Sequence, residues 1–342
     1  MVSTSTLIRE HEVTIAEAAI LMEILTEAGD TVMLWSMPGI GKNGIVDQLG
    51  AKLKRKVIPF HAALRETVDL RGIPMGNTST GTTQWLVPDE LPQAERDGEF
   101  GYLFLDEINQ ANPQMQAVLG GLILDRRVGD YKLPPGWRII AAGNRVSDKA
   151  AAQRMPTHLR NRMAHIFITP DVDAWTKWAN ANSVAPEVVA FVRLRRELIH
   201  MMPKGDENAF PTPRSLTKAA KYVHAPKEHR MRLFASLIGD AVAAELDGFI
   251  ELYRSLGSLD DIAANPDSAN IPTEPSVRFA VCTGLGRLAN RKNFANIIRY
   301  AQRLPRESEI LVVTDATGRD KTLKNVAAYG EWAVRNADLT VQ

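Results

Sequence analysis

The chain has 342 residues, of which 45% are hydrophobic and 24% are charged, an ordinary composition for a soluble globular protein with two or three domains. A formal net charge of +1 excludes a uniformly basic nucleic-acid-binding protein, and a single cysteine excludes an intrachain disulfide. The sequence begins without a secretory signal pattern and has no apolar run long enough to span a bilayer. We therefore expect a cytoplasmic protein that does not cross a membrane.

The first predicted element is an amphipathic helix over residues 15–28. Thr14 and Glu17 have the spacing of a capping box, apolar residues recur at helical intervals after them, and Gly29 can end the helix. A β-branched and apolar run over residues 31–35 then predicts a strand.

Residues 31–48 have the order of strand, glycine-bearing loop, lysine and helix that suits a phosphate-binding loop. Backbone N–H groups and the helix N-terminus bind phosphate oxygens in such a loop, and Lys42 reaches the β- and γ-phosphates. Two fixed positions of the pattern G-x-x-x-x-G-K-[ST] differ, because Ser36 replaces the first glycine and Asn43 replaces the hydroxyl residue that binds Mg²⁺. We predict that the following residues bind the nucleotide: Pro38, Gly39, Ile40, Gly41, Lys42, Asn43 and Gly44.

Both departures are chemically tolerable. The amide oxygen of Asn43 can still ligate Mg²⁺, although less compactly than a hydroxyl. Ser36 fits in place of glycine if its φ is negative, since Gly39 and Gly41 make the close approach to phosphate.

Strands and helices then alternate up to about residue 170. We predict helices over residues 44–53 and 112–124, a hairpin around 76–83, and strands over 56–60, 101–106, 137–142 and 164–169. This alternation predicts a parallel α/β sheet with flanking helices.

Polar side chains follow two of the predicted strands. Asp106 and Glu107 come directly after a run buried on both faces, at the edge of a parallel sheet where ligands bind. Asp106 is placed to hold Mg²⁺, together with Asn43, and Glu107 is placed to polarise a water molecule for attack on the γ-phosphate. Asn144 ends the next strand, where its amide can orient that water.

After residue 170 the predicted strands cease. We predict helices over residues 171–182, 186–200, 212–224 and 227–255, a loop over 260–275, and further helices over 277–338 around one possible strand at 309–313.

The chain resembles AAA+ ATPases of the MoxR-type and dynein-related branch, which includes the magnesium-chelatase-like proteins. The resemblance covers residues 32–222 and rests on the phosphate loop, LFLDEINQANPQMQAVL from Leu103, IIAAGN from Ile139, MPTHLRNRM from Met155 and FPTPRSL from Phe210. It implies a P-loop NTPase core followed by an all-α AAA+ lid and a mostly helical C-terminal extension. The corresponding domains are residues 1–170, 171–256 and 257–342.

The resemblance also implies roles for three arginines. The segment at residues 159–163 matches the one that offers an arginine finger to a neighbouring subunit, with Arg162 as the first choice and Arg160 as the alternative. Thr212 and Pro213 suit the start of a helix, so Arg214 stands in its first turn, where the family's second sensor arginine reaches the γ-phosphate from the lid.

A further matching segment, residues 69–74, resembles the approach to the family's central-pore loop. Trp85 lies in the hairpin that follows, where it either contacts a substrate or packs in the core, and we favour the core.

The resemblance implies an ATPase that binds ATP and Mg²⁺, forms a ring homo-oligomer, expected to be a hexamer, and remodels a protein client. The client is expected to carry a von Willebrand factor A domain. Asn43 favours an alternative, an ATP-gated assembly scaffold with little hydrolysis. A nucleic-acid-directed motor is a third alternative, which the near-zero net charge disfavours.

Overall fold

The structure is a computed structural model that describes residues 12–145, 155–203, 205, 207–255 and 259–337. Its contacts divide the chain into two compact units, Met1–Ala174 and Trp175–Gln342. The boundary falls inside helix α8 (Val172–Ala181). The division of residues 175–342 into a lid and a C-terminal extension remains a prediction.

The first unit is built on a parallel six-stranded sheet with the order β1-β10-β2-β9-β6-β3. The predicted α/β class is confirmed, and every predicted strand of this sheet is present to within one or two residues. The two-residue edge strand β1 is the one that the pattern did not predict. The strands are β1 (Glu12–Val13), β2 (Val32–Ser36), β3 (Lys56–His61), β6 (Phe100–Asp106), β9 (Gly136–Gly143) and β10 (Ala164–Ile168).

Strand β9 lies between β2 and β6 in the sheet, although it follows both of them in the chain. All six strands are parallel, so their carboxyl ends meet at one edge. The residue after β9 is therefore held between the loop after β2 and the carboxylates that end β6. This order brings Asn144 between Lys42 and Asp106.

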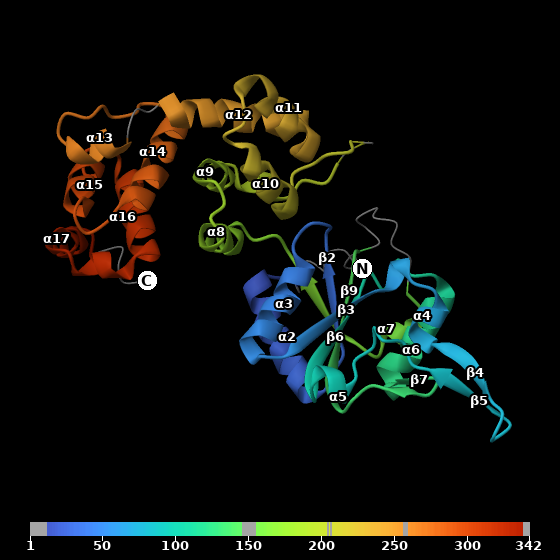
Figure 1. The fold of residues 1–342 in the computed structure, drawn as a ribbon. Helices are drawn as coiled ribbons and strands as arrows, with labels where there is room; N and C mark the ends of the chain where they lie inside the picture. The colour runs from blue at the N-terminus through green and yellow to red at the C-terminus, as the bar shows by residue number, and fades with distance from the viewer. Residues whose placement is uncertain (1–11, 146–154, 204, 206, 256–258, 338–342) are drawn as a thin grey trace, which may run out of the picture. The chain divides into compact units, whose positions relative to one another are not determined.

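Helices cover both faces of the sheet (Figure 1). Helices α2 (Ile15–Ala28) and α3 (Lys42–Leu53) pack on one face and share a buried cluster with Leu34 of β2. Helices α6 (Pro113–Asp125) and α7 (Thr157–Arg160) pack on the other face, where Met33 joins their cluster. Successive β2 residues thus point into two different cores, which explains why the strand reads as a continuous apolar run.

The smaller elements of the first unit lie around β3 and β6. Two antiparallel pairs, β4–β5 and β7–β8, form outside the main sheet, and the first is the predicted hairpin. These elements are η1 (Ala62–Leu64), α4 (Thr67–Arg71), β4 (Ile73–Asn77), β5 (Thr82–Leu86), α5 (Ala94–Asp97), β7 (Arg127–Val128) and β8 (Tyr131–Lys132).

Helix α2 has the predicted bounds. The Thr14 hydroxyl accepts a hydrogen bond from the Glu17 amide, and the Glu17 carboxylate accepts one from the Thr14 amide. Gly29 ends the helix with a φ of 96°, a left-handed conformation that glycine adopts without steric cost. Capping side chains of this kind contribute about 1 kcal/mol.

Every secondary-structure element among the described residues of the second unit is a helix. Its elements after α8 are α9 (Pro186–Leu194), η3 (Arg196–Ile199), α10 (Pro213–Ala219), η4 (Ala220–Tyr222), α11 (Lys227–Ile238), α12 (Asp240–Ser255), α13 (Leu259–Ala264), α14 (Pro275–Leu288), α15 (Phe294–Ala301), α16 (Arg306–Arg319), η5 (Lys321–Asn325) and α17 (Ala327–Arg335).

Some sequence predictions for this unit are wrong. The single helix over 227–255 is two helices, because Gly239 has a φ of 81° and a Cβ there would meet the Ala209 carbonyl oxygen at 2.8 Å. The possible strand at 309–313 lies inside α16, where Val312 and Val313 face the core. The helix over 186–200 ends at Leu194, and the loop over 260–275 begins with α13.

Among the described residues, no helix combines the length and the apolar character that crossing a lipid bilayer requires.

Candidate functional site

Two glycines with positive φ angles shape the loop between β2 and α3. Gly39 has a φ of 82° and Gly41, the N-cap of α3, has a φ of 108°. A Cβ on Gly41 would meet no atom within 4 Å, so the backbone conformation, and not lack of space, requires glycine there. Helix α3 starts at Lys42, two residues before the predicted start at Gly44, which places the lysine in the first turn.

The ammonium group of Lys42 lies at the centre of the site. Its Nζ donates to Asn144 Oδ1 at 2.7 Å and to Ser36 Oγ at 3.1 Å. Ser36 is fully buried at the end of β2, and its φ is outside the positive range. The serine therefore replaces the first glycine of the motif without backbone strain, and it adds a hydroxyl partner for the lysine.

Asp106 connects the end of β6 with the start of α3. Its Oδ1 accepts a hydrogen bond from the Glu107 amide at 2.9 Å, and its Oδ2 accepts one from Asn43 Nδ2 at 3.0 Å. Glu107 has a φ of 55°, a left-handed conformation that costs a non-glycine residue about 1–3 kcal/mol. Strain of this kind concentrates at functional sites, and it turns the half-buried Glu107 away from the direction of the strand.

Asn109, which sequence reasoning left without a role, holds Asn144 in place. It is fully buried, and its Nδ2 donates to the Asn144 carbonyl oxygen at 2.7 Å. A Cβ on Gly143 would meet Asn109 Oδ1 at 2.4 Å, so the Asn109 side chain packs against a position where glycine leaves room for it. The sequence alone carries no signal for this role, because the role depends on a hydrogen bond to a residue 35 positions away in the chain.

Comparison with family models identifies this part of the chain. Residues 31–163 match the model of the AAA domain, dynein-related subfamily. This range, called the AAA domain below, is less than half of the chain, so the match describes residues 31–163 and not the whole protein. The matched range contains the phosphate loop, the carboxylates after β6, Asn144 and both candidate finger arginines.

Comparisons of the whole chain add less. No curated protein matches it. Similar solved structures include the RuvB branch migration motor of Thermotoga maritima (17% identity, 80% of each chain covered, TM-score 0.38). A putative ATPase from Cytophaga hutchinsonii has 13% identity, with 89% of this chain and 82% of that chain covered, at a TM-score of 0.35. Brucella abortus NtrX in complex with ADP has 14% identity, with 98% and 69% covered, at the same TM-score. Scores this low carry no argument about function.

The oxygen atoms of the AAA domain's site suit Mg²⁺. This hard cation takes one or two carboxylates together with phosphate oxygens and water. Asp106 supplies the carboxylate and Asn43 an amide oxygen, but the amide nitrogen of Asn43 faces Asp106, so the side chain must rotate to present its oxygen. In the described part of the chain, no cluster of three His, Cys, Asp or Glu side chains forms a separate metal site.

His61 is a second residue that sequence reasoning missed. It is the last residue of β3 and pairs with Asp106 in the sheet, and its Nδ1 lies 3.6 Å from Asp106 Oδ2. The predicted strand ended one residue earlier, at Phe60, and so excluded it. The imidazole and the Asn43 amide thus both lie beside Oδ2 of Asp106.

The two candidate finger arginines of the AAA domain differ in their surroundings. Arg160 is half-buried and donates to Thr157 Oγ1 at 3.3 Å. Arg162 is exposed, and among the described residues its guanidinium forms no hydrogen bond or ion pair. Leu159 and Met163 are buried in the core beside them. The backbone is therefore anchored on both sides of Arg162 while its side chain is available to another molecule.

Arg214 lies in the second unit, outside the AAA domain. The predicted local structure is confirmed: the Thr212 hydroxyl caps α10 by accepting from the Ser215 amide at 3.0 Å, and Pro213 is its first residue. Arg214 is exposed in the first turn. Its approach to the nucleotide remains a prediction.

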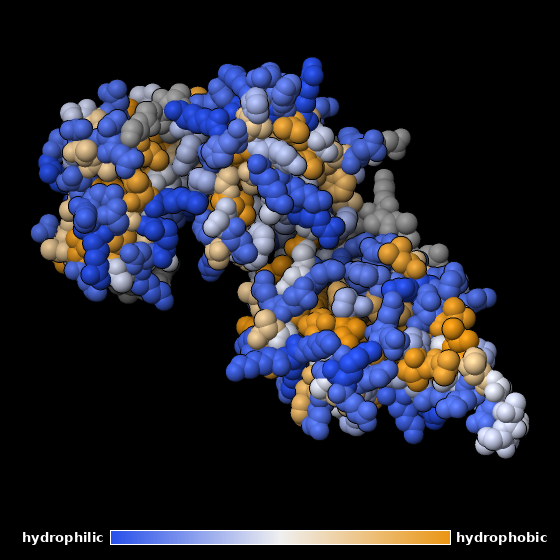
Figure 2. Space-filling view, in the orientation of Figure 1, coloured by the Kyte–Doolittle hydropathy of each residue, from blue (hydrophilic) through white to orange (hydrophobic). Residues whose placement is uncertain are grey.

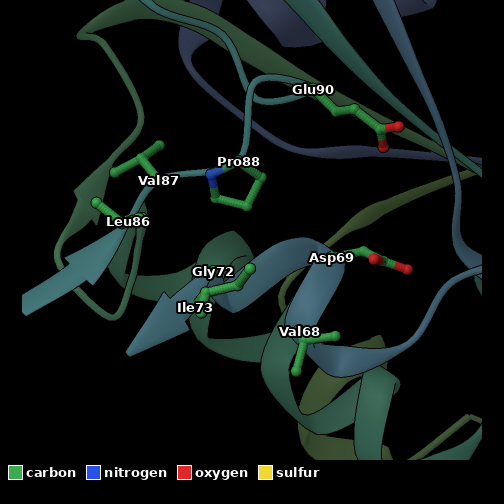
Figure 3. Close-up of a pocket in the computed structure, with 8 residues that line it drawn as sticks. All are labelled: Val68, Asp69, Gly72, Ile73, Leu86, Val87, Pro88 and Glu90. Atoms are coloured by element: carbon green, nitrogen blue, oxygen red, sulfur yellow. The ribbon is translucent and has the colours of Figure 1, made fainter. Parts of the chain in front are cut away.

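The hairpin of the AAA domain borders an apolar groove of about 310 Å³ (Figure 3). Figure 2 shows hydrophobic surface in this part of the unit. Trp85 is half-buried, with Arg71 stacked 4.7 Å from its ring centre, so it is less buried than a core residue. The residues that line the groove are Val68, Asp69, Gly72, Ile73, Leu86, Val87, Pro88 and Glu90.

Proposed function

We propose that the AAA domain binds ATP with Mg²⁺ and hydrolyses it within a ring-shaped homo-oligomer that remodels a protein partner. The convergence of Lys42, Asn144 and Asp106 at one sheet edge carries this proposal. Lys42 is bonded to Asn144 at 2.7 Å, and the residue after it is bonded to Asp106 at 3.0 Å. A lysine, an amide and a carboxylate gathered around a glycine loop match the needs of phosphoryl transfer.

Each residue has a defined task in this proposal. The loop N–H groups and Lys42 bind the phosphates, and the lysine exchanges its contacts with Ser36 and Asn144 for phosphate oxygens. Asn144, released from the lysine, orients the attacking water, and Glu107 accepts its proton. Mg²⁺, when bound by Asp106 and Asn43, neutralises charge that develops on the phosphate oxygens.

Arg162 is the better candidate for the arginine finger. A guanidinium that acts on a neighbouring subunit has to be exposed and uncommitted, as Arg162 is among the described residues, whereas Arg160 is half-buried and bonded to Thr157. An arginine supplied in trans stabilises charge on the transferred phosphoryl group. A finger that acts in trans also requires a closed ring, and we propose a hexamer.

The MoxR-type role is the finer part of the proposal. Its support is the motif resemblance described above, and the proposed client is a protein with a von Willebrand factor A domain in the cytoplasm. The chain's net charge of +1 supports a protein partner over a nucleic acid. Stimulation of phosphate release by a purified von Willebrand factor A domain protein, and not by duplex DNA, would support this assignment.

The contact between Asn43 and Asp106 favours a second candidate function. In this contact the amide nitrogen of Asn43 donates a hydrogen bond to Asp106 Oδ2, an oxygen that a magnesium ion would need as a ligand. If nucleotide binds without displacing this contact, the chain is an ATP-gated scaffold that assembles but hardly hydrolyses.

Phosphate release by the wild type, Glu107→Gln and Lys42→Ala separates the two functions. The proposed ATPase requires that Glu107→Gln binds a fluorescent ATP analogue like the wild type but releases phosphate at least about 100-fold more slowly. Lys42→Ala should bind the analogue poorly. Equal phosphate release by wild type and Glu107→Gln would establish the scaffold instead. Sedimentation with ATP and Mg²⁺ tests the ring, and a monomer at high concentration would contradict it.

A further inference from the structure

A chain of hydrogen bonds links the strand of the phosphate loop to the arginine segment, residues 159–163. Trp35 of β2 directly precedes Ser36, the hydroxyl partner of Lys42. The Trp35 indole N–H donates to His165 Nδ1 at 2.8 Å, and His165 Nε2 lies 2.8 Å from the Arg160 carbonyl oxygen. Trp35 pairs with Phe167 in the sheet, so the tryptophan and His165 are diagonal neighbours on one face of β2 and β10.

Both hydrogen bonds of His165 have a fixed direction. An indole N–H can only donate and a carbonyl oxygen can only accept, so Nδ1 of His165 accepts and Nε2 carries the proton. The imidazole is therefore held at both ring nitrogens. Trp35 lies nearly parallel to it, with ring centroids 6.0 Å apart, which further fixes the ring plane.

The Arg160 carbonyl is one of the last carbonyl groups of α7, which have no partner within the helix. It accepts from the Met163 amide at 3.3 Å and from His165. Within the described chain, His165 supplies the side-chain hydrogen bond to the backbone of the arginine segment. Leu159 and Met163 bury the ends of the segment, and His165 fixes the turn between them.

We propose that His165 is a positioning residue, which orients the arginine segment toward the nucleotide of a neighbouring subunit. Trp35 connects His165 to the strand that precedes the phosphate loop. The phosphate loop, which serves the subunit's own site, and the arginine segment, which serves the neighbour's site, are therefore linked through Trp35 and His165. The proposal rests on the hydrolysis and ring proposed above. In this proposal, His165 affects ATP hydrolysis in the neighbouring subunit and not in its own subunit.

Mixed rings test this assignment directly. A Glu107→Gln subunit cannot hydrolyse ATP but still offers its arginine, whereas an Arg162→Ala subunit keeps its own site but offers none. In a mixed ring, the active site of an Arg162→Ala subunit becomes active when its neighbour is a Glu107→Gln subunit, because that neighbour supplies an intact Arg162. We expect His165→Ala to lower turnover about 10- to 100-fold, to bind ATP normally, and to be rescued by Glu107→Gln as Arg162→Ala is. Failure of that rescue, with Arg162→Ala rescued, would overturn the proposal.

Substitutions of intermediate chemistry separate positioning from folding. His165→Gln keeps an N–H that can reach the Arg160 carbonyl and should recover most of the activity, and Trp35→Phe keeps the ring but loses the N–H and should fall between the two. His158→Ala is the matched control, because His158 is an exposed histidine of α7 with no hydrogen bond among the described residues. Equal losses in His158→Ala and His165→Ala would contradict the assignment.

Limited trypsin digestion gives a readout that does not need hydrolysis. We expect His165→Ala to be cut after Arg160 and Arg162 at least about fivefold faster than wild type, with cleavage after the exposed Lys132 unchanged and with His165→Gln restoring protection. If the wild type releases no phosphate, the proposed function fails, but this digestion still decides whether His165 holds the segment. Unchanged cleavage would overturn the positioning role.

Discussion

Asn43 Nδ2 donates to Asp106 Oδ2 at 3.0 Å, so the residue that replaces the hydroxyl of the phosphate-loop motif is bonded to the carboxylate expected to hold magnesium. Binding of the metal requires that this bond break and that the amide rotate. The Asn43 amide would therefore have to give up this hydrogen bond to present its oxygen to a metal, and this change has a free-energy cost.

This cost predicts the effect of restoring the motif. Asn43→Thr should lower the Mg²⁺ concentration for half-maximal ATPase activity about tenfold, because the hydroxyl ligates without rotation of an amide. Phosphate release measured across a magnesium titration checks this. Ser36→Gly restores the other motif position and is the control: it should leave the magnesium requirement unchanged, since it touches Lys42 and not the metal ligands. An unchanged requirement in Asn43→Thr would contradict the prediction.

Asn109 should matter to catalysis through Asn144. Asn109→Ala removes the hydrogen bond to the Asn144 carbonyl, so we expect a stability loss of about 1–3 kcal/mol and a lower kcat with little change in KM. Gln116 of α6 is the matched control, because it is also buried and its side chain donates to the Ala111 carbonyl at 2.9 Å and not to Asn144. Gln116→Ala should lose similar stability in urea unfolding and keep its kcat. Parallel losses of kcat in both variants would refute the role.

Asp97 should make the first unit sensitive to acid. The hydrogen bonds from Arg96, with those from Lys56 and the Gln93 amide, hold the pKa of this carboxyl far below its usual range. A folded-state pKa below the unfolded value of about 3.9 stabilises the protein above that value, and this stability is lost as the pH falls below about 5. Asp97→Asn should therefore cost about 1–3 kcal/mol at pH 7 and progressively less toward pH 3.

Urea unfolding of wild type and Asp97→Asn at several pH values measures this difference. Asp89, whose side chain is 98% exposed, provides the control, and Asp89→Asn should change stability little at any pH. A difference between wild type and Asp97→Asn that does not shrink on acidification would show that the carboxylate is not the source of the stability.

Cys282 should be inert in the folded protein. Burial in α14 raises the pKa of its thiol to about 12, so almost no thiolate is present at pH 8. A thiol reagent such as 5,5′-dithiobis(2-nitrobenzoate) should label the native chain only as fast as the second unit opens, and should label it at once in urea. Because Cys282 is the single cysteine, its labelling rate reports on that unit alone. Fast labelling without denaturant would contradict the burial.

Patterns that depend on local chemistry were predictable from the sequence. The capping box and Gly29 fixed both ends of α2, and a run of apolar residues identified the central strand that ends at Asp106. The grouping of Lys42, Asp106 and Asn144 followed from the rule that parallel strands end at a common edge.

Features that depend on contacts between distant residues were not predictable. The break at Gly239 depends on the nearby Ala209 carbonyl, and Asn109 matters only because Asn144 and Gly143 lie against it. The residues at 309–313 are β-branched in part, but burial against α14 in the second unit makes them helical. In each case tertiary packing decided what local propensity left open.

The position of β9 between β2 and β6 also determines the width of the site. Neighbouring strands are about 4.8 Å apart, so the strand before Lys42 and the strand that ends at Asp106 are separated by about 10 Å. Backbone hydrogen bonds on both sides of β9 maintain this separation. The sheet therefore acts as a rigid frame of constant span. If the chain hydrolyses ATP as proposed, the movement that follows phosphate release has to arise in the loops at the edge of this sheet and in the segments attached to them.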